Sequence, residues 1–223
     1  MQFENRADAG RELADRLGYL SGRHPIVLGL PRGGAVVARQ VADGLGAAMD
    51  VLLVHRVSAP ERPELVVGAV GEGGVLVTNA DLLSQYRLSR QDMDIAVRTA
   101  LTELDRRTTL YRRGLPPLEV AGRTVVLVDD AIATGATVRA ALRVLHGREA
   151  GRVVLAVPVA PADVLEELAH NADHTVCPNP RVWMRAVGHW YRDFPPVSDE
   201  DVLPLLDRRT RTPKQAASPA PDL

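Results

Sequence analysis

The sequence predicts an α/β fold in which a doubly wound, mainly parallel sheet is flanked by helices. Residues 125–128 are apolar with no polar alternation, which is typical of an inner strand covered on both faces. Strand-like and helix-like segments alternate through the second half of the chain, and this favours parallel strands joined by crossover helices. A glycine-rich turn at 31–34 joins an apolar run to an amphipathic segment, as expected of a βα unit.

The first part of the chain predicts a covering helix followed by that βα unit. Apolar residues recur at helical spacing over residues 5–20, and Gly22 follows as a stop signal. Residues 26–30 form a short apolar run, which predicts a strand, and a second helix is expected after the turn at 31–34. The inward positions are Ala9, Leu13, Leu17 and Leu20 in the first helix and Val37, Ala38, Val41 and Leu45 in the second.

Residues 49–57 predict the next strand, with His55 and Arg56 at its polar end. After it the pattern changes. Residues 59–64 are rich in proline and glutamate and are expected to form a loop. Residues 65–78 contain two short apolar runs on either side of a glycine turn, which predicts a small hairpin.

A long polar helix is expected at 89–113. The stretch from Arg87 to Arg113 holds seven arginines against four acidic residues. Such a basic ridge could bind RNA or a partner, but a solvated face with ion pairs one helical turn apart explains the same composition. The sparse apolar positions are Ile95, Val97, Leu101, Leu104 and Leu110.

The second half of the chain predicts further strands and helices in alternation. After the inner strand at 125–128, a helix is expected with Val138, Leu142 and Leu145 facing inward. A strand at 153–159, a helix around 164–168 and a short strand at 175–177 follow.

Aromatic residues are only 4% of the chain, yet four of them fall between residues 183 and 194. Because aromatic rings stack on flat heteroaromatic bases, this segment is a candidate cover for a base, and simple closure of the core is the alternative. Trp190 and Tyr191 are the candidate stacking residues; the others are Trp183 and Phe194.

The chain is expected to be one domain spanning 1–205, followed by a disordered tail at 206–223. Its 223 residues suffice for a sizeable core. Ser198 and Asp201 form a capping box for a last short helix, and the residues beyond it carry few apolar side chains.

Composition argues against several classes of protein. A net charge of -1 argues against bulk binding of nucleic acid or anionic membranes. Cys177 is the only cysteine, which rules out an internal disulfide and a zinc cluster; we expect it to be a buried strand residue. The sequence has no signal-type segment and no apolar run long enough to cross a membrane, so a cytoplasmic protein is expected.

The chemistry is expected at the carboxyl end of the strand at 125–128, where open α/β sheets bind ligands. The turn at 134–137 offers little bulk, hydroxyls and backbone amides at the start of a helix, which suits a phosphate monoester. Asp129 and Asp130 repel a phosphate. They are therefore expected to accept hydrogen bonds from vicinal hydroxyls or to hold a cation carried by the ligand. A sugar phosphate meets both demands.

These residues resemble the signature of the type I phosphoribosyltransferases, which is an apolar strand, two acids and a turn ending in Thr-Gly-x-Thr. The resemblance implies that Asp129 and Asp130 bind the 2- and 3-hydroxyls of phosphoribosyl pyrophosphate (PRPP) together with Mg²⁺, while the turn binds its 5-phosphate. It also implies a flexible lid at the hairpin and a hood over the base at 178–205. The turn residues carried over are Ala131, Ala133, Thr134, Gly135, Ala136 and Thr137.

The resemblance extends to the earlier glycine-rich turn, which binds pyrophosphate in the family. Gly33 and Gly34 would let backbone amides approach the anion, and Arg32 would add a bidentate cation. Arg56 is expected to help neutralise the leaving pyrophosphate, an exposed edge charge being the alternative. Ala133 stands where hypoxanthine and guanine enzymes carry an acid, which speaks against 6-oxopurine salvage.

The implied activity is transfer of the ribose 5-phosphate group from PRPP to a nitrogen nucleophile, expected to be a nucleobase, with release of pyrophosphate. Mg²⁺ would enter with PRPP, and a homodimer is expected. With reference pKa values of about 4, both acids are expected to be ionised at neutral pH unless the site is very dry. The alternative is a non-catalytic, PRPP-sensing regulator or nucleic-acid-binding protein on the same fold. The arginine-bearing helix would be its nucleic-acid surface.

Overall fold

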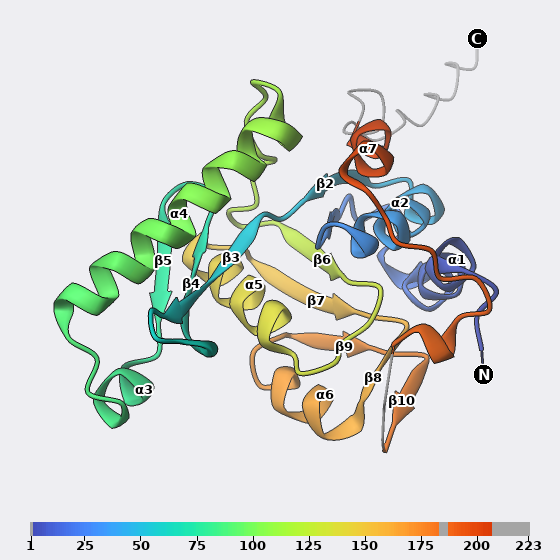
Figure 1. Ribbon diagram of the computed structural model, residues 1–223. Coiled ribbons are helices and arrows are strands. Elements are labelled where there is room, and N and C mark those ends of the chain that lie inside the picture. Colours follow the sequence, from blue (N-terminus) through green and yellow to red (C-terminus); the bar gives the residue numbers. More distant parts are fainter. Residues whose placement is uncertain (1, 183–186, 207–223) are drawn as a thin grey trace, which may run out of the picture.

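The computed structural model describes residues 2–182 and 187–206, and its centre is a five-stranded parallel sheet (Figure 1). The strand order is β2-β1-β6-β7-β9, and every neighbouring pair is parallel. The doubly wound, mainly parallel sheet predicted from the sequence is confirmed. Its strands are β1 (Ile26–Gly29), β2 (Ala48–Val51), β6 (Thr124–Val128), β7 (Arg152–Ala156) and β9 (His174–Val176).

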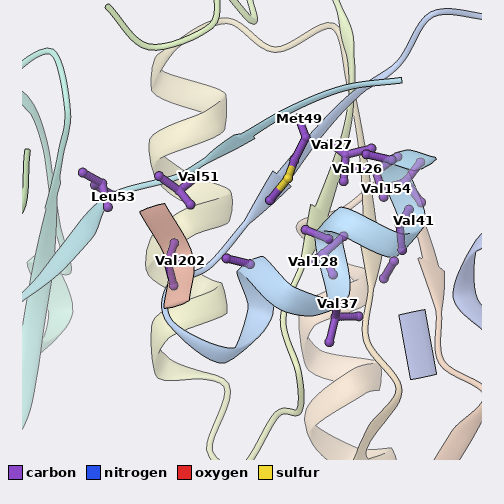
Figure 2. Close-up of a cluster of buried hydrophobic side chains, with 14 of the residues drawn as sticks. Val27, Val37, Val41, Met49, Val51, Leu53, Val126, Val128, Val154 and Val202 are labelled. Carbon is purple, nitrogen blue, oxygen red and sulfur yellow. The ribbon is translucent and has the colours of Figure 1, made fainter. Parts of the chain in front are cut away.

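Helices cover both faces of this sheet, and β6 shows why its sequence is uniformly apolar. Val126 and Val128 pack on the side of the first two helices (Figure 2), whereas Val125 and Leu127 pack on the side of the later two. A strand covered on both faces has no solvent side that would favour polar residues. The covering helices are α1 (Arg6–Arg16, followed by η1, Gly18–Leu20) and α2 (Gly33–Leu45) on one face, and α5 (Ala136–Gly147) and α6 (Ala162–Ala169) on the other.

A three-stranded antiparallel sheet, β3-β4-β5, lies between α4 and α5 (Figure 1). The hairpin predicted at 65–78 is confirmed, with Gly73 and Gly74 in the left-handed region at its turn. The loop predicted at 59–64 is wrong, because β4 begins at Arg62, which pairs with Ala59 across a tight turn. The elements are β3 (Val54–Ala59), β4 (Arg62–Gly71), β5 (Val75–Thr78) and α3 (Ala80–Gln85).

The long helix predicted at 89–113 is α4 (Arg90–Arg112). Ser89 and Asp92 form a capping box at its start. Its buried face differs in part from the expected one, because Ile95 is 43% exposed and small residues fill the contact instead. The buried residues of α4 are Ala96, Ala100, Leu104, Tyr111 and Arg112.

The strand predicted at 49–57 is wrong as a single element. β2 ends at Val51 and β3 begins at Val54, in a different sheet. At the break, the Leu52 amide donates to the Gly29 carbonyl at 3.1 Å, and both Leu52 and Leu53 are buried. The apolar run continues through the break, which explains why its composition does not reveal it.

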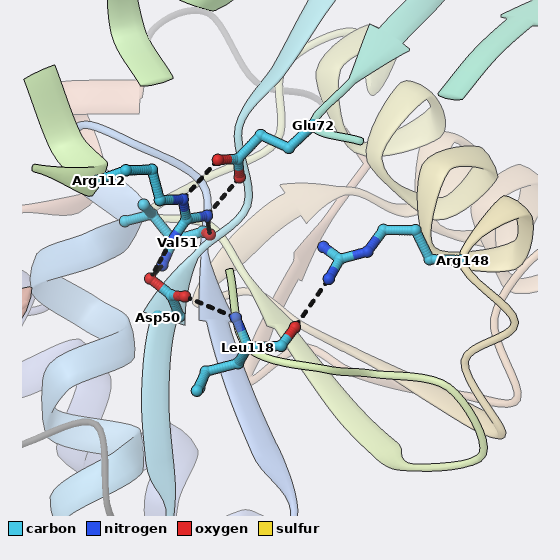
Figure 3. A network of polar contacts seen from close by, with 6 residues as sticks. All are labelled: Asp50, Val51, Glu72, Arg112, Leu118 and Arg148. Atoms are coloured by element: carbon cyan, nitrogen blue, oxygen red, sulfur yellow. Dashed lines mark hydrogen bonds and ion pairs between the residues drawn. The ribbon is translucent and has the colours of Figure 1, made fainter. Parts of the chain in front are cut away.

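A buried ion network fixes the end of α4 to the main sheet (Figure 3). Arg112 is 5% exposed and forms ion pairs with Asp50 of β2, at 2.6 Å, and with Glu72 after β4. It also donates to the Val51 carbonyl at 2.9 Å, and Asp50 accepts from the Leu118 amide at 3.1 Å. The network joins segments that lie far apart in the sequence.

The C-terminal part adds short elements beside the main sheet. The strand predicted at 153–159 is two strands, because β7 ends at Ala156 and Val159 opens β8. The capping box of Ser198 and Asp201 is confirmed, and Leu206 belongs to the last turn; the rest of the predicted tail lies outside the described residues. The elements are β8 (Val159–Pro161), β10 (Asn179–Arg181), η2 (Val187–Trp190), α7 (Asp199–Val202) and η3 (Leu203–Leu206). Across residues 2–182 and 187–206, no helix combines the length and apolar character that a membrane span requires.

Candidate functional site

Two turns meet where the strand order of the main sheet reverses. From β1 the chain winds to β2 on one side, and it later returns to β6 on the other side of β1. At such a point the connections diverge to opposite faces and leave a crevice at the carboxyl ends of the strands. The turn after β1 leads into α2, and the turn after β6 leads into α5. Both turns therefore start at the same edge of the main sheet, and each leads to a helix N-terminus.

Asp129 and Asp130 begin the second turn, and both are partly buried. The Asp130 amide donates to Asp129 Oδ1 at 2.9 Å, and the Leu30 amide donates to the Val128 carbonyl at 2.8 Å. Desolvation raises the pKa of Asp129 well above its ordinary value, and the adjacent charge of Asp130 raises it further. Ionisation of both acids is expected only if the site is not very dry, and the desolvated Asp129 holds its proton more tightly than an exposed carboxyl does.

The glycine turn packs directly against this acid pair. A Cβ on Gly33 would lie 1.9 Å from Asp130 Oδ2, and one on Gly34 would lie 2.9 Å from Asp129 Oδ1. The Pro31-Arg32 peptide bond is cis. The two glycines are therefore needed for the contact between the turns, in addition to the backbone access inferred from the sequence.

The small-residue turn between the acids and α5 is open to solvent. Ala133, Thr134 and Thr137 are exposed, whereas Gly135 is buried with φ +73°. The α5 helix has its first hydrogen bond from the Arg139 amide to the Gly135 carbonyl, at 2.8 Å. The amides of residues 136–138 precede that bond and form the positive end of the helix.

Two neighbours of the turn limit which of its amides an anion can reach. Ile132 is buried and its amide donates to the Val159 carbonyl of β8 at 3.0 Å, so this amide is already engaged. Ala131 packs beside the Phe3 and Tyr191 cluster. The Ile132 amide is therefore not available to an anion, whereas the exposed part of the turn begins at Ala133.

Arg6 is a site residue that sequence reasoning missed. It opens α1 and is 8% exposed, and its Nε donates to Asp130 Oδ2 at 2.7 Å. Its Nη1 donates to the Pro195 carbonyl at 2.8 Å, and its guanidinium lies 3.7 Å from the centre of the Phe194 ring. Nothing in the local sequence distinguishes Arg6 from a surface arginine at the start of a helix.

The two arginines proposed for catalysis lie in different places. Arg32 is the residue before α2 and makes no side-chain capping hydrogen bond, and it is exposed. Arg56 is exposed on β3, in the antiparallel sheet and outside the sheet that carries the acid pair. A role of Arg56 at the leaving pyrophosphate assumes that its strand belongs to the main sheet, whereas β3 belongs to the antiparallel one.

The aromatic segment is divided between core and surface. Tyr191 is 3% exposed, stacks on Phe194 with ring centres 4.7 Å apart, and donates to the Asp130 carbonyl at 2.5 Å. This buried position corrects its assignment as a ring that stacks on a base. Trp190 is partly buried and packs against the same cluster, with the Arg181 guanidinium 4.0 Å from its ring centre. Trp183 lies outside the described residues.

The carboxyl groups of Asp129 and Asp130 suit a cation that enters together with a ligand. They do not form a complete metal site by themselves. Within the described ranges, no group of three or more His, Cys, Asp and Glu side chains is arranged to hold a metal ion. Asp129 and Asp130 supply two adjacent carboxyl groups. Oδ2 of Asp130 already accepts a hydrogen bond from Arg6. Mg²⁺ bound with substrate phosphates commonly uses one or two protein carboxylates and retains water, and these residues fit that pattern.

Known proteins of similar sequence bear on the family of this chain. Two curated relatives, from strains CDC 1551 / Oshkosh and H37Rv of Mycobacterium tuberculosis, each carry the name "Putative phosphoribosyl transferase" and are 47% identical over 209 residues, 94% of this chain. The chain spans 47%, about half, of the length of each relative.

The crystal structure of TT1426 from Thermus thermophilus is similar over 92% of this chain and 98% of that one, with 44% identity and a TM-score of 0.84. A family model described as the phosphoribosyl transferase domain matches residues 2–187. That range includes the glycine turn, the acid pair and the turn into α5. This chain therefore belongs to the phosphoribosyl transferase domain family.

Proposed function

We propose that this chain binds PRPP with Mg²⁺ and transfers its ribose 5-phosphate group to a nitrogen nucleophile, with release of pyrophosphate. PRPP carries two anionic groups on either side of a ribose diol. The N-terminus of α2 packs against Asp129 and Asp130, and the turn that follows these acids along the chain leads to the N-terminus of α5. Helix N-termini favour anions, and carboxylates accept from hydroxyls.

The observation that carries the proposal is the contact between the glycine turn and the acid pair. Because a Cβ on Gly33 would lie 1.9 Å from Asp130 Oδ2, a group held by the glycine turn and a diol held by the acids would lie within one small molecule. A plain βα turn has no need for this approach. The arrangement supports one ligand with both a diol and a nearby pyrophosphate.

In the proposed reaction the protein positions its substrates and uses no covalent nucleophile. The amides at the start of α5 would hold the 5-phosphate, Asp129 and Asp130 would orient the ribose, and the 32–34 turn would hold the pyrophosphate as it leaves. Positioning of this kind supplies up to about 7–11 kcal/mol of a barrier. When bound, Mg²⁺ would offset the negative charge of the pyrophosphate and the acids.

The acceptor is proposed to be a nucleobase or a similar nitrogen heterocycle. Ala133 is exposed at the rim of the turn and brings no carboxylate there. Trp190, with the Arg181 guanidinium over its ring, remains the candidate for contact with the acceptor. Tyr191 is not proposed for this role because it is buried.

Part of the arginine ridge on α4, which would serve the alternative of a nucleic-acid-binding PRPP sensor, is paired within the chain. Arg106 and Arg107 pair with Glu103, at 2.9 Å and 3.0 Å, and Arg112 is buried in the network with Asp50. Arginines that are neutralised within the chain contribute little to a phosphate-binding surface. The homodimer and the cytoplasmic location expected from the sequence stay predictions, and light scattering tests the first.

Calorimetry with PRPP and Mg²⁺ tests the binding site. Asp129→Asn combined with Asp130→Asn is expected to abolish measurable binding, because the ribose loses both acceptors of charge-assisted hydrogen bonds. A matched control, Asp15→Asn combined with Asp105→Asn, removes the same charge at two exposed positions and is expected to bind as the unaltered chain does. Undiminished affinity in the first double variant would remove the acid pair from the site.

Release of pyrophosphate tests catalysis separately. The chain is incubated with PRPP, Mg²⁺ and a panel of nucleobases, and pyrophosphate is measured with each. Release that depends on one base supports the transferase and identifies the acceptor. Tight PRPP binding with no release for any base favours the sensor.

A further inference from the structure

Arg6 connects three parts of the molecule that the proposed reaction must hold together. It comes from the first turn of α1, it contacts the second acid of the pair, and it contacts the segment 194–195 that follows the aromatic cluster. Its side chain is 9% exposed. It is therefore held away from solvent at the edge of the crevice.

The contacts of Arg6 use the planar guanidinium in three directions. Nε donates to Asp130 Oδ2 at 2.7 Å, Nη1 donates to the Pro195 carbonyl at 2.8 Å, and the flat face lies 3.7 Å from the Phe194 ring centre. A lysine ammonium is a point charge on a flexible stem and cannot make all three contacts at once. The geometry is therefore specific to arginine.

The same segment reaches the acid pair by a second route. The Tyr191 hydroxyl donates to the Asp130 backbone carbonyl at 2.5 Å, and its ring stacks on Phe194. Asp130 is therefore held at its carboxylate by Arg6 and at its carbonyl by Tyr191. If the 191–195 segment moved, it would displace Asp130 through both contacts.

We propose that Arg6 is a positioning residue that orients the Asp130 carboxylate toward the sugar and couples it to the 191–195 segment. The proposal rests on the proposed function, because it assigns Asp130 to the ribose diol. With Oδ2 held by Arg6 beside Gly33, the carboxylate keeps one orientation when a sugar hydroxyl arrives. Without Arg6, the Asp130 carboxylate loses the donor that fixes its orientation and can turn away from the diol.

Two small ligands separate this role from general support of the fold. On the proposed function, ribose 5-phosphate would contact both the α5 turn and the acid pair, whereas inorganic phosphate, at either anion-binding turn, has no sugar to offer the acids. The ratio of their dissociation constants, measured by calorimetry, therefore reports the sugar contacts alone. If Arg6 only supports the fold, its replacement would weaken the binding of both ligands by the same factor and leave the ratio unchanged.

Arg6→Met keeps the apolar stem and removes the charged head. We expect ribose 5-phosphate to bind about tenfold more weakly, the size of a lost charge-assisted contact, and phosphate to bind within about twofold of the unaltered chain. Arg6→Lys keeps the charge and is expected to lose only about threefold, because one of the three contacts can persist. Arg6→Lys also keeps the test valid if Arg6→Met does not fold, which thermal unfolding reports.

A matched control is Arg192→Met. Arg192 also joins the N-terminal segment to the aromatic one, through an exposed ion pair with Glu4 at 2.7 Å, but it does not touch Asp130. This variant is expected to leave the ratio unchanged. An unchanged ratio in Arg6→Met and Arg6→Lys overturns the proposal for Arg6.

Failure of the proposed function gives a different result. One outcome is that the unaltered chain binds ribose 5-phosphate no more tightly than phosphate. In that case the acid pair does not bind the sugar hydroxyls, and the assignment of the diol to Asp130 is wrong. If the unaltered chain prefers ribose 5-phosphate and the Arg6 variants keep that preference, only the role of Arg6 is lost.

Discussion

Gly33 lies so close to Asp130 that a Cβ at position 33 would sit 1.9 Å from the Asp130 carboxylate. The residue is the first of α2, and Asp130 is the second residue after β6, so the contact joins the two turns at the switch point of the sheet. Because the contact leaves no free space, a larger side chain at Gly33 would displace Asp130, and a shift of Asp130 would displace the glycine turn. The proposed pyrophosphate turn and the proposed ribose acids therefore behave as one unit.

Gly33→Ala is expected to weaken PRPP binding at least tenfold and to lower the free energy of unfolding by about 1–3 kcal/mol, the usual cost of overpacking. The added methyl group must push Asp130 or Arg6 away. Calorimetry and urea unfolding measure the two effects. Gly18→Ala is the control, because nothing lies within 4 Å of a Cβ there, and it is expected to change stability by no more than about 0.5 kcal/mol. If Gly33→Ala and Gly18→Ala had the same PRPP affinity and the same free energy of unfolding, the close contact at Gly33 would be contradicted.

Local patterns predicted the parts of this molecule that depend on neighbouring residues. The apolar run at 125–128, the glycine turn after β1 and the capping box of Ser198 are each short segments whose residue types determine their conformation. The fold class follows from them because alternating strands and helices form few topologies. The position of the acid pair at a strand end follows in the same way.

Contacts between distant residues could not be predicted in this way. Arg6 and Asp130 are 124 positions apart, and no periodicity relates them. Arg112 looks like its neighbours in an arginine-rich helix, yet it alone of Arg106, Arg107 and Arg112 is buried. The break at Leu52 is hidden because both sheets need apolar residues there. Tertiary packing decided each of these cases, and the local sequence carried no sign of it.

Arg112→Met is expected to lower the free energy of unfolding by about 3–5 kcal/mol, because it leaves Asp50 and Glu72 buried without their cation. Urea unfolding monitored by circular dichroism measures the loss. Arg107→Met provides the comparison, since its pair with Glu103 is far less buried than the Arg112 network and is expected to contribute less than about 1 kcal/mol. A loss below about 1 kcal/mol for Arg112→Met would mean that the network does not hold α4 to the sheet.

Cys177 is expected to react slowly with thiol reagents. Burial raises the pKa of its thiol from 9.0 to about 11, so the thiolate is scarce at pH 8. Reaction with a disulfide reagent at pH 8 is expected to be about a hundredfold slower in the folded chain than in denaturant, and to speed up with pH toward 11. Because Cys177 is the only cysteine, the signal has one source. A rate that levels off near pH 9 in the folded chain would place the thiol in contact with solvent.

Arg32→Ala and Arg56→Ala decide which arginine serves the leaving group. Arg32 stands at the N-terminus of α2, beside the turn proposed to hold pyrophosphate, so its loss is expected to weaken pyrophosphate about tenfold and ribose 5-phosphate by no more than about twofold. Arg56 lies on β3 in the other sheet, and its loss is expected to leave both ligands within about twofold. Calorimetry with each ligand measures all four changes. If Arg32→Ala weakens the binding of both ligands equally, Arg32 contributes only general positive charge. If Arg56→Ala selectively weakens the binding of pyrophosphate, Arg56 belongs to the site. That result would require β3 to approach the site when pyrophosphate binds.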